Sequence, residues 1–377
     1  MNNSYLSRIF QMKSVNDFAL GLVSVFIPIY LLDLGYSVQI VFSWMLVLFT
    51  SFTITIFIST YLTNKIGFVY TFYIRFIFLI SHLGLLILLP KHPFLLFITA
   101  ILTGIEWSLF WIPLNILFVR NTLENKTGMA LSKLSVYSEV LSMFSPIIGA
   151  FIVTRFGFPV LFFTAMILAL LATIPLFPLK SEKTDFKFTL IHAKKIYFKY
   201  KVFFKTEIIA RLAEDTGAIW SIFVYLQLAN KFNIGVISTV AGVAGLFFAL
   251  TIGKLTDDWS KHSLLKIGAI SVTFVWIISF VIGTSSTNPW LFYLATFIMG
   301  LALKTFIIPY RTMLWNSGRK DDAQFVVLRE IPSFLGRVIL FGLAIIFYDK
   351  LAILILIIGL IFLYFVLTDS RRLEVPN

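Results

Sequence analysis

Five acidic residues interrupt stretches of the chain that are otherwise almost entirely apolar: Asp17, Glu106, Glu139, Asp215 and Glu330. In apolar surroundings a carboxyl group can take up a proton near neutral pH, which is the requirement for coupling to a proton gradient. Glu106 is the first candidate for this exchange, because it lies in the middle of its apolar stretch and is followed closely by Trp107 and Trp111. A structural carboxylate that is hydrogen-bonded to a neighbouring helix is the alternative. For Asp17 and Asp215, a favourable position at a helix N-terminus explains the acid without any exchange.

Basic and aromatic residues give a second set of candidates, for binding rather than coupling. Lys304 and Arg311 are seven residues apart, as are Glu330 and Arg337, so each pair lies on one face of a helix. Lys304 and Arg337 either bind an anionic group or neutralise buried acids. An aromatic pocket is expected around five further residues: Trp107, Trp111, Tyr137, Trp220 and Tyr225.

The elements that must position these residues follow from composition. Of 377 residues, 59% are hydrophobic and only 13% are charged, about half the charged share of a soluble domain. Such a chain cannot cover a surface that faces water, so a soluble enzyme is excluded and an integral membrane protein is predicted. The sequence has no cysteine, hence no disulfide or thiolate metal site. It also lacks a phosphate-binding loop and a histidine-rich metal motif, so no cofactor, no metal and no enzymatic activity are expected.

Hydropathy predicts an all-α membrane protein with twelve transmembrane helices, since each span requires about 20 apolar residues. Residues 1–179 form a first bundle of six helices, residues 180–205 a basic cytoplasmic linker, and residues 206–377 a second bundle of six. The expected spans are 15–33, 38–61, 68–89, 93–117, 129–153, 158–179, 206–228, 235–256, 264–283, 289–315, 322–346 and 351–368.

Orientation follows from the distribution of Lys and Arg. The even-numbered connections and both tails hold 23 of these residues, against four in the odd-numbered connections. Basic loops remain on the cytoplasmic side. Both termini and the linker are therefore predicted to be cytoplasmic, in a multi-pass protein of the inner (plasma) membrane. The net charge of +13 is explained by contact with an anionic leaflet, without nucleic acid as a partner.

The second half repeats features of the first at a nearly constant offset. Gly104 and Pro113 match Gly300 and Pro309, 196 residues further on. The pairs Asn16-Asp17 and Glu214-Asp215, Leu62-Thr63-Asn64 and Leu255-Thr256-Asp257, and Ser138-Glu139 and Arg329-Glu330 also correspond in chain order. Two parallel repeats of six helices are indicated, with the functional site at their interface.

The segment Gly253-Lys254-Leu255-Thr256-Asp257-Asp258-Trp259-Ser260-Lys261 resembles the signature loop of the major facilitator superfamily. The first-half copy, residues 60–67, is degenerate. Residues 145–150 are similar to the motif that proton-coupled efflux members carry in span 5, with Pro146 and Gly149 retained and Ser145 and Ala150 altered. This resemblance implies a gating role for Gly253, Asp257, Lys261, Pro146 and Gly149, and rocking of two bundles. Glu139 and Glu330 then either pair with bases of the signature loops as a gate, or hold helices together.

The function expected from these observations is a secondary active transporter, namely proton-coupled efflux of small amphipathic molecules by alternating access. The alternatives are an importer or facilitator of a nutrient or organic anion, a lipid flippase, and a sensor that transports nothing. The expected partners are a small-molecule substrate, protons or another ion, and the lipid bilayer, with the protein acting as a monomer.

Overall fold

The computed structural model describes residues 3–121, 140–184, 190–318 and 321–368, and every regular element within these ranges is a helix. The first bundle contains α1 and α2, which together make the first span, followed by α3, α4, α5, α7 and α8 and the 3₁₀ turn η2. Their bounds are α1 Asn3–Val23, α2 Phe26–Asp33, α3 Val38–Ile66, α4 Phe68–Leu88, α5 Leu95–Asn121, α7 Ser145–Phe156, α8 Phe158–Leu171 and η2 Ile174–Leu176.

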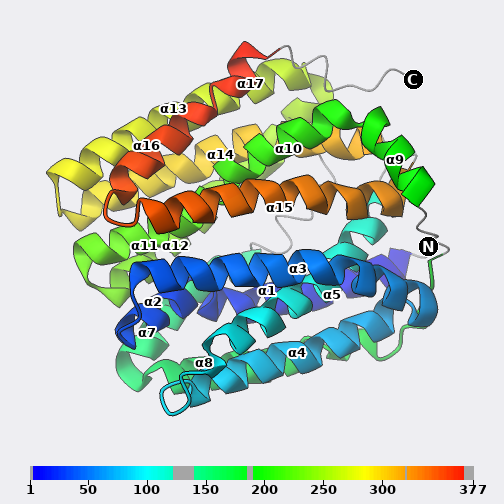
Figure 1. Ribbon diagram of the computed structural model, residues 1–377, viewed down its shortest axis with the longest axis horizontal. Coiled ribbons are helices and arrows are strands. Elements are labelled where there is room, and N and C mark those ends of the chain that lie inside the picture. The colour runs from blue at the N-terminus through cyan, green and yellow to red at the C-terminus, as the bar shows by residue number, and fades with distance from the viewer. Residues whose placement is uncertain (1–2, 122–139, 185–189, 319–320, 369–377) are drawn as a thin grey trace.

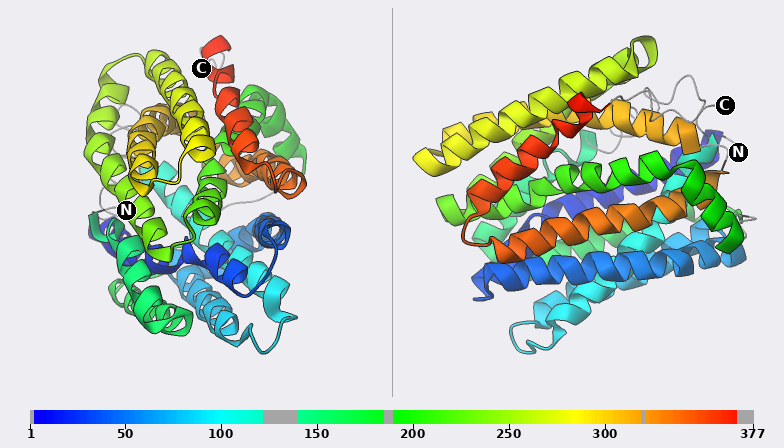
Figure 2. Two further views of the ribbon diagram at one scale, coloured as in Figure 1. Left: turned by 90° about the vertical axis from the view of Figure 1, so that its left-hand side faces the viewer. Right: turned by 45° about the horizontal axis from the view of Figure 1, so that its top comes forward.

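The linker contains α9, and the second bundle contains α10 to α17. Their bounds are α9 Leu190–Lys199, α10 Lys201–Glu214, α11 Thr216–Leu228, α12 Lys231–Asp258, α13 Lys261–Ser285, α14 Pro289–Gly318, α15 Asp322–Ile346, α16 Leu351–Ile361 and α17 Tyr364–Leu367. The two bundles lie side by side, the first below and the second above in Figure 1. The end-on view in Figure 2 separates them in the same way.

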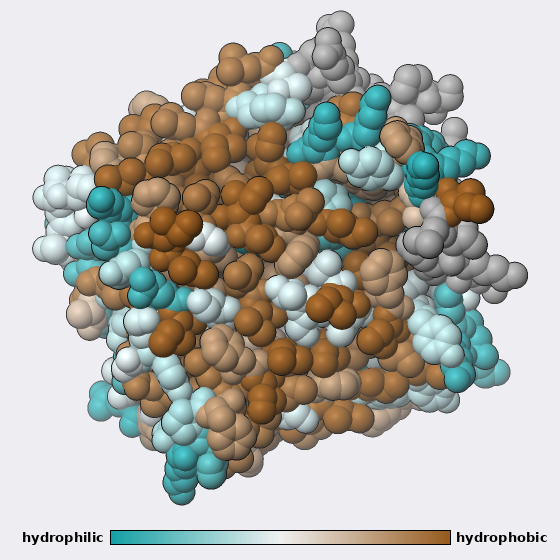
Figure 3. All heavy atoms as spheres, in the orientation of Figure 1, coloured by the Kyte–Doolittle hydropathy of each residue, from teal (hydrophilic) through white to brown (hydrophobic). Residues whose placement is uncertain are grey.

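The two ends of the molecule carry different elements. The linker side is the end that carries α9 and the start of α1, and the far side is the end that carries the connection between α2 and α3 (Figure 1). Apolar side chains cover the middle of the face shown in Figure 3, whereas polar ones gather towards the two ends. Large hydrophobic residues such as Ile77, Phe247 and Phe274 are exposed, as expected where lipid replaces water.

Eight helices are long and apolar enough to cross a membrane, and two shorter apolar helices cover residues 140–156 and 351–367. The predicted spans 206–228 and 322–346 do not meet that standard. Their helices, α10 with α11 and α15, carry more charged residues than a hydrophobic span tolerates. Charge inside a membrane bundle is retained where it is paired or functional. These two spans are therefore the best candidates for carrying a functional site.

The structure corrects the predicted start of the first span. The helix begins at Asn3 rather than at residue 15, so Asp17 lies well inside α1 and not at its N-terminus. Stabilisation by the helix dipole, which falls off within the first turn, therefore does not explain this acid. The seventh span also begins earlier, at Lys201, and is broken at Asp215, where α10 ends and α11 begins.

Equivalent glycines hold the helix pairs of the two bundles at close range. A Cβ atom on Gly104 of α5 would lie 2.3 Å from the carbonyl oxygen of Leu48 in α3, and one on Gly300 of α14 would lie 2.7 Å from that of Ala241 in α12. Only glycine permits such contact between backbones. The repeat read from the sequence thus corresponds to the same packing in both halves.

Candidate functional site

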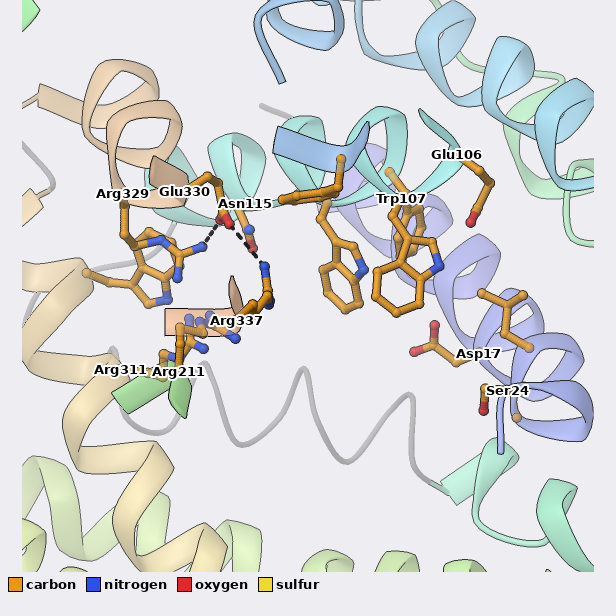
Figure 4. A pocket seen from close by; sticks show the side chains of 16 residues that line it. Asp17, Ser24, Glu106, Trp107, Asn115, Arg211, Arg311, Arg329, Glu330 and Arg337 are labelled. Atoms are coloured by element: carbon orange, nitrogen blue, oxygen red, sulfur yellow. Dashed lines mark hydrogen bonds and ion pairs between the residues drawn. The ribbon is translucent and has the colours of Figure 1, made fainter. Parts of the chain in front are cut away.

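A cavity of about 550 Å³ lies between the two bundles. This central cavity is lined on one side by α1, α3 and α5 and on the other by α10, α14 and α15, as the close-up in Figure 4 shows. The first wall presents Asp17, Glu106, Trp107 and Trp111, and the opposite wall presents mainly arginine and glutamate. The site therefore combines aromatic surface with ionisable groups contributed by both repeats.

Glu106 forms a fully buried ion pair with Arg75 of α4. The Arg75 guanidinium also lies over the rings of Phe76 and Phe110, at 4.8 and 4.4 Å from their centres. The second carboxylate oxygen of Glu106 has no hydrogen-bond partner among the described residues. The cation that pairs with Glu106 is therefore Arg75, from the neighbouring helix α4.

Asp17 occupies the same wall, one helix away. It pairs with Lys13, one turn earlier on α1, and the Lys13 ammonium lies 5.7 Å from the centre of the Trp111 ring. Figure 4 shows Asp17 pointing towards the cavity, below Trp107. The first wall is thus balanced in charge, with two acids and two bases in contact.

The opposite wall is built on α15. Glu330 pairs with the neighbouring Arg329 and lies 3.9 Å from Arg337, while Arg337 donates to Asp215, at the break between α10 and α11, over 2.7 Å. The expectation that Glu330 pairs with a base of the loop 253–261 is therefore wrong. Glu330 lies two turns inside α15 and faces the cavity, where the arginines of its own helix are nearer.

A second carboxylate, Glu207 of α10, anchors this wall from behind. It is fully buried and accepts hydrogen bonds from four donors, Arg211 at 3.0 Å, Arg329 at 2.9 Å, Ser333 at 2.8 Å and Tyr310 at 2.7 Å. A buried carboxylate that is saturated in this way fixes the positions of its partners. Glu207 therefore holds α10, α14 and α15 together and orients the arginines that line the cavity.

Glu214 completes the cluster by accepting from Arg311 over 2.7 Å and lying 3.3 Å from Arg211. The second wall consequently contains four arginines and four acids, each in an ion pair: Arg211, Arg311, Arg329, Arg337, Glu207, Glu214, Asp215 and Glu330. Because the charges cancel, this wall carries no excess of positive charge.

A second cavity of about 460 Å³ adjoins the first, and both are lined by Leu20, Ser24, Trp107 and Arg337. Its surface is largely apolar, with Trp44, Phe49 and Phe341 among its aromatic residues. We call it the aromatic chamber. Pockets of this size that combine apolar walls with a few polar groups are typical of small-molecule sites.

The two bundles are joined from the middle of the molecule to its far side. Asp33, at the end of α2, pairs with Lys231, at the start of α12, and accepts a hydrogen bond of 2.5 Å from Tyr225 of α11. Phe341 stacks on Phe49 with ring centres 5.4 Å apart. Further hydrogen bonds and ring contacts between described residues of the two halves lie in the same region.

The remaining predicted site residues lie outside the cavities or at their edge. Trp220 is buried within the second bundle, where its indole donates to Thr296 over 3.1 Å. Tyr225 belongs to the far-side contact, and Lys304 lies on α14 away from both cavity linings. Tyr137 and Glu139 fall outside the described residues.

The predicted gating residues are distributed over both bundles. Gly253 and Asp257 lie in the last turns of α12, and Lys261 is the first residue of α13. Pro146 of α7 lines the aromatic chamber. Gly149 lies so close to α1 that a Cβ atom would approach the Leu22 carbonyl oxygen to 2.3 Å.

Several residues of the site were missed by sequence reasoning. Glu207, Arg211 and Glu214 follow one another at helical spacing on one face of α10, and Arg329 precedes a residue that was selected. This spacing predicts that their side chains are neighbours on the surface of a helix and can form ion pairs. In contrast, nothing in the sequence indicates that Asp33 meets Lys231, because these residues are almost 200 positions apart.

A bundle of apolar helices in two repeats, with charged cavities at their interface, defines a membrane transport protein. The sequence profile of the Major Facilitator Superfamily matches residues 12–327. This chain belongs to the Major Facilitator Superfamily, whose members are transporters and not enzymes, and it is a multi-pass membrane protein.

Among curated relatives, the multidrug resistance protein MdtG of Escherichia fergusonii is 27% identical over 59% of this chain and 57% of its own length. MdtG of Salmonella arizonae is 28% identical over 54% of this chain and 53% of its own length. The matches thus span little more than half the length of these relatives.

Solved structures show the same fold. The proton:xylose symporter XylE superposes with a TM-score of 0.74 at 13% identity, covering 100% of this chain and 97% of that one. A bacterial homologue of the iron transporter ferroportin, in an outward-facing state, gives 0.68 at 14% identity and covers 96% of this chain and 98% of that one. At these identities the likeness supports the fold alone.

Proposed function

We propose that this chain is a secondary active transporter that exports small amphipathic molecules, coupled to protons, by alternating access. The observation that carries the proposal is the pair of adjoining cavities between the bundles, which combine tryptophan-rich walls with a buried carboxylate, Glu106. Contacts on the far side join the bundles beyond these cavities. Rocking of the bundles about the cavities would expose the site to each side in turn.

The nature of the walls favours amphipathic substrates. Trp107 and Trp111 of the first bundle and Trp315 of the second offer flat apolar surface in the central cavity. Around them each charge is already paired, so a substrate binds without having to neutralise an excess charge. The relatives named as multidrug resistance proteins support the same substrate class.

Glu106 is the proposed proton carrier. One of its oxygens contacts Arg75, and the other has no hydrogen-bond partner among the described residues and can receive a proton. Protonation would end the ion pair with Arg75 and loosen α5 from α4, which links the proton to the packing of the first bundle. Glu330, Asp17, Asp215 and Glu139 are the next candidates if Glu106 is structural.

The orientation of the chain forms part of the proposal. With the linker and both termini in the cytoplasm, the far side is external, and the described contacts close the protein to the outside. Reporters placed near Lys194 and in the connection 285–288 should give cytoplasmic and external signals respectively. The reverse result, or the same side for both, would contradict this orientation.

Transport in proteoliposomes, measured with and without a pH step, tests the proposed coupling. Substrate movement should respond to the pH gradient, and Glu106→Gln should abolish that response while binding is retained. Glu182→Gln, which removes an exposed carboxylate from the linker, is the matched control and should respond like the native protein. A native pH response in folded Glu106→Gln protein would assign the role to another acid.

Uptake of an organic anion is the second candidate, because four arginines line the central cavity. In the structure all four contact acids, so an anion would have to displace a carboxylate first. Uptake of an aromatic carboxylate down its own gradient, at a rate that a pH step does not change, would favour this candidate over proton-coupled export.

A further inference from the structure

The aromatic chamber contains an imidazole that takes part in none of the ion pairs described above. His82 of α4 is only 2% exposed, and it lines the chamber. Its Nδ1 atom has no hydrogen-bond partner in the described part of the chain. A buried polar group without a partner costs stability, so its retention in an apolar wall requires an explanation.

The neighbouring polar groups are already used. Thr103, which also lines the chamber, donates its hydroxyl to the Thr99 carbonyl over 2.7 Å. Trp44 donates its indole N–H to the Thr99 hydroxyl over 3.0 Å. His82 lies two helical turns after Arg75 and so faces the same side of α4. Arg75 meets Glu106 there, whereas no acid of the described ranges is paired with His82.

We infer that His82 is a substrate-binding residue that recognises the hydroxyl group of an uncharged aromatic molecule. The inference rests on the proposed transport function and specifies the substrate class of that site. A neutral imidazole offers one donor and one acceptor, and a hydroxyl group can serve as the partner of either nitrogen. The ring also forms a hydrogen bond with the backbone of Phe78, one turn earlier on α4, which leaves one nitrogen for such a hydroxyl group.

The rest of the chamber fits the remainder of such a molecule. Trp44, Trp107, Phe49 and Phe341 supply flat apolar surface for an aromatic body. The charged residues of the chamber are all in ion pairs, Asp215 with Arg337 and Glu214 with Arg311. A substrate charge would find no free partner there, whereas a hydroxyl group would satisfy His82.

Binding of two probes of equal shape tests the inference. We suggest 1-hydroxypyrene and 1-methylpyrene, followed by energy transfer from the tryptophans to pyrene in purified protein. The native protein should bind the hydroxylated probe about tenfold more tightly, the difference expected for one buried hydrogen bond. His82→Phe should remove this preference by weakening 1-hydroxypyrene alone, and His82→Gln should restore much of it.

Two controls separate this inference from the proposed function. His92→Phe changes an exposed histidine in the connection between α4 and α5 and should keep the preference. Glu182→Gln, which changes an exposed carboxylate of the linker, should also keep it. An equal preference in native and folded His82→Phe protein, or no preference in the native protein, overturns the inference. Loss of pH-driven transport with the preference intact would count against coupling only.

Discussion

Tyr225 of α11 donates a hydrogen bond of 2.5 Å to the carboxylate of Asp33 at the end of α2, and Lys231 pairs with the same carboxylate. One acid of the first bundle thus accepts two contacts from the second bundle, on the far side of both cavities. The three residues are partly exposed, so each contact is modest in energy. Under the proposed alternating access, together they would hold the far side closed and break when the bundles rock.

The first prediction concerns this far-side contact. Asp33→Asn should weaken both interactions and raise the far-side-open population several-fold, since the loss amounts to about 1–2 kcal/mol. Distances between spin labels at His92 and Thr287, exposed residues of far-side connections in the two bundles, report this population. Exchanging the charges, with Asp33→Lys and Lys231→Asp together, should restore closure in part. Unchanged distances in Asp33→Asn protein would show that the contact does not control closure.

A second prediction concerns the buried pair of Arg75 and Glu106. Arg75→Met leaves a carboxylate buried without its cation and should lower stability by about 3–5 kcal/mol. The double substitution Arg75→Met with Glu106→Gln removes both charges and should recover most of that loss. Thermal unfolding of the three variants in detergent measures the effect. A double variant no more stable than Arg75→Met alone would mean that packing of the arginine, not its charge, dominates.

The third prediction concerns the signature loop. Asp257→Asn at the end of α12 should shift the population between conformations and leave substrate binding intact, because the residue lies at the linker side and outside both cavity linings. The same pair of spin labels, together with probe binding, separates these effects. The exposed neighbour Asp258→Asn is the control. If Asp257→Asn changed neither population nor transport, the gating role implied by the family would not apply to this chain.

The fourth prediction concerns the junction of linker and second bundle. Tyr200 is buried between α9 and α10, and its hydroxyl donates to Asp321 over 2.5 Å, with the Ser317 carbonyl oxygen 3.0 Å away. Burial, and then this hydrogen bond to Asp321, raises the pKa of the Tyr200 hydroxyl to about 12. A raised pKa in the folded state means that stability is complete below pH 10 and falls as the pH rises towards 12.

Tyr200→Phe should therefore be less stable than the native protein near neutral pH, and the difference should shrink between pH 10 and pH 12. Thermal unfolding at a series of pH values gives this difference curve. Tyr197→Phe, which removes a half-exposed phenol hydroxyl from α9, is the control, and its stability should depend on pH as that of the native protein does. A pH-independent difference would mean that the phenol contributes packing alone.

The sequence by itself determined the membrane class, the helical fold and the repeat. Helix in a bilayer is enforced by the need to satisfy every backbone polar group locally, so apolar length alone reveals most spans. Residues such as Gly104 and Gly300 then marked the repeat, because close helix packing requires the same small residue at equivalent places. Glu106, Trp107 and Arg337 were selected for similar local reasons and do line the cavities.

The partners of these residues were decided only by the tertiary structure. The pairing of Glu106 with Arg75, the four donors around Glu207 and the contact of Asp33 with Lys231 all join separate helices. Helix rotation and tilt set which faces meet, and these depend on the packing of all neighbours together. The burial of the His82 Nδ1 atom without a hydrogen-bond partner among the described residues is likewise invisible in sequence, since an apolar stretch with one histidine looks the same whether that residue faces lipid, a helix or a cavity.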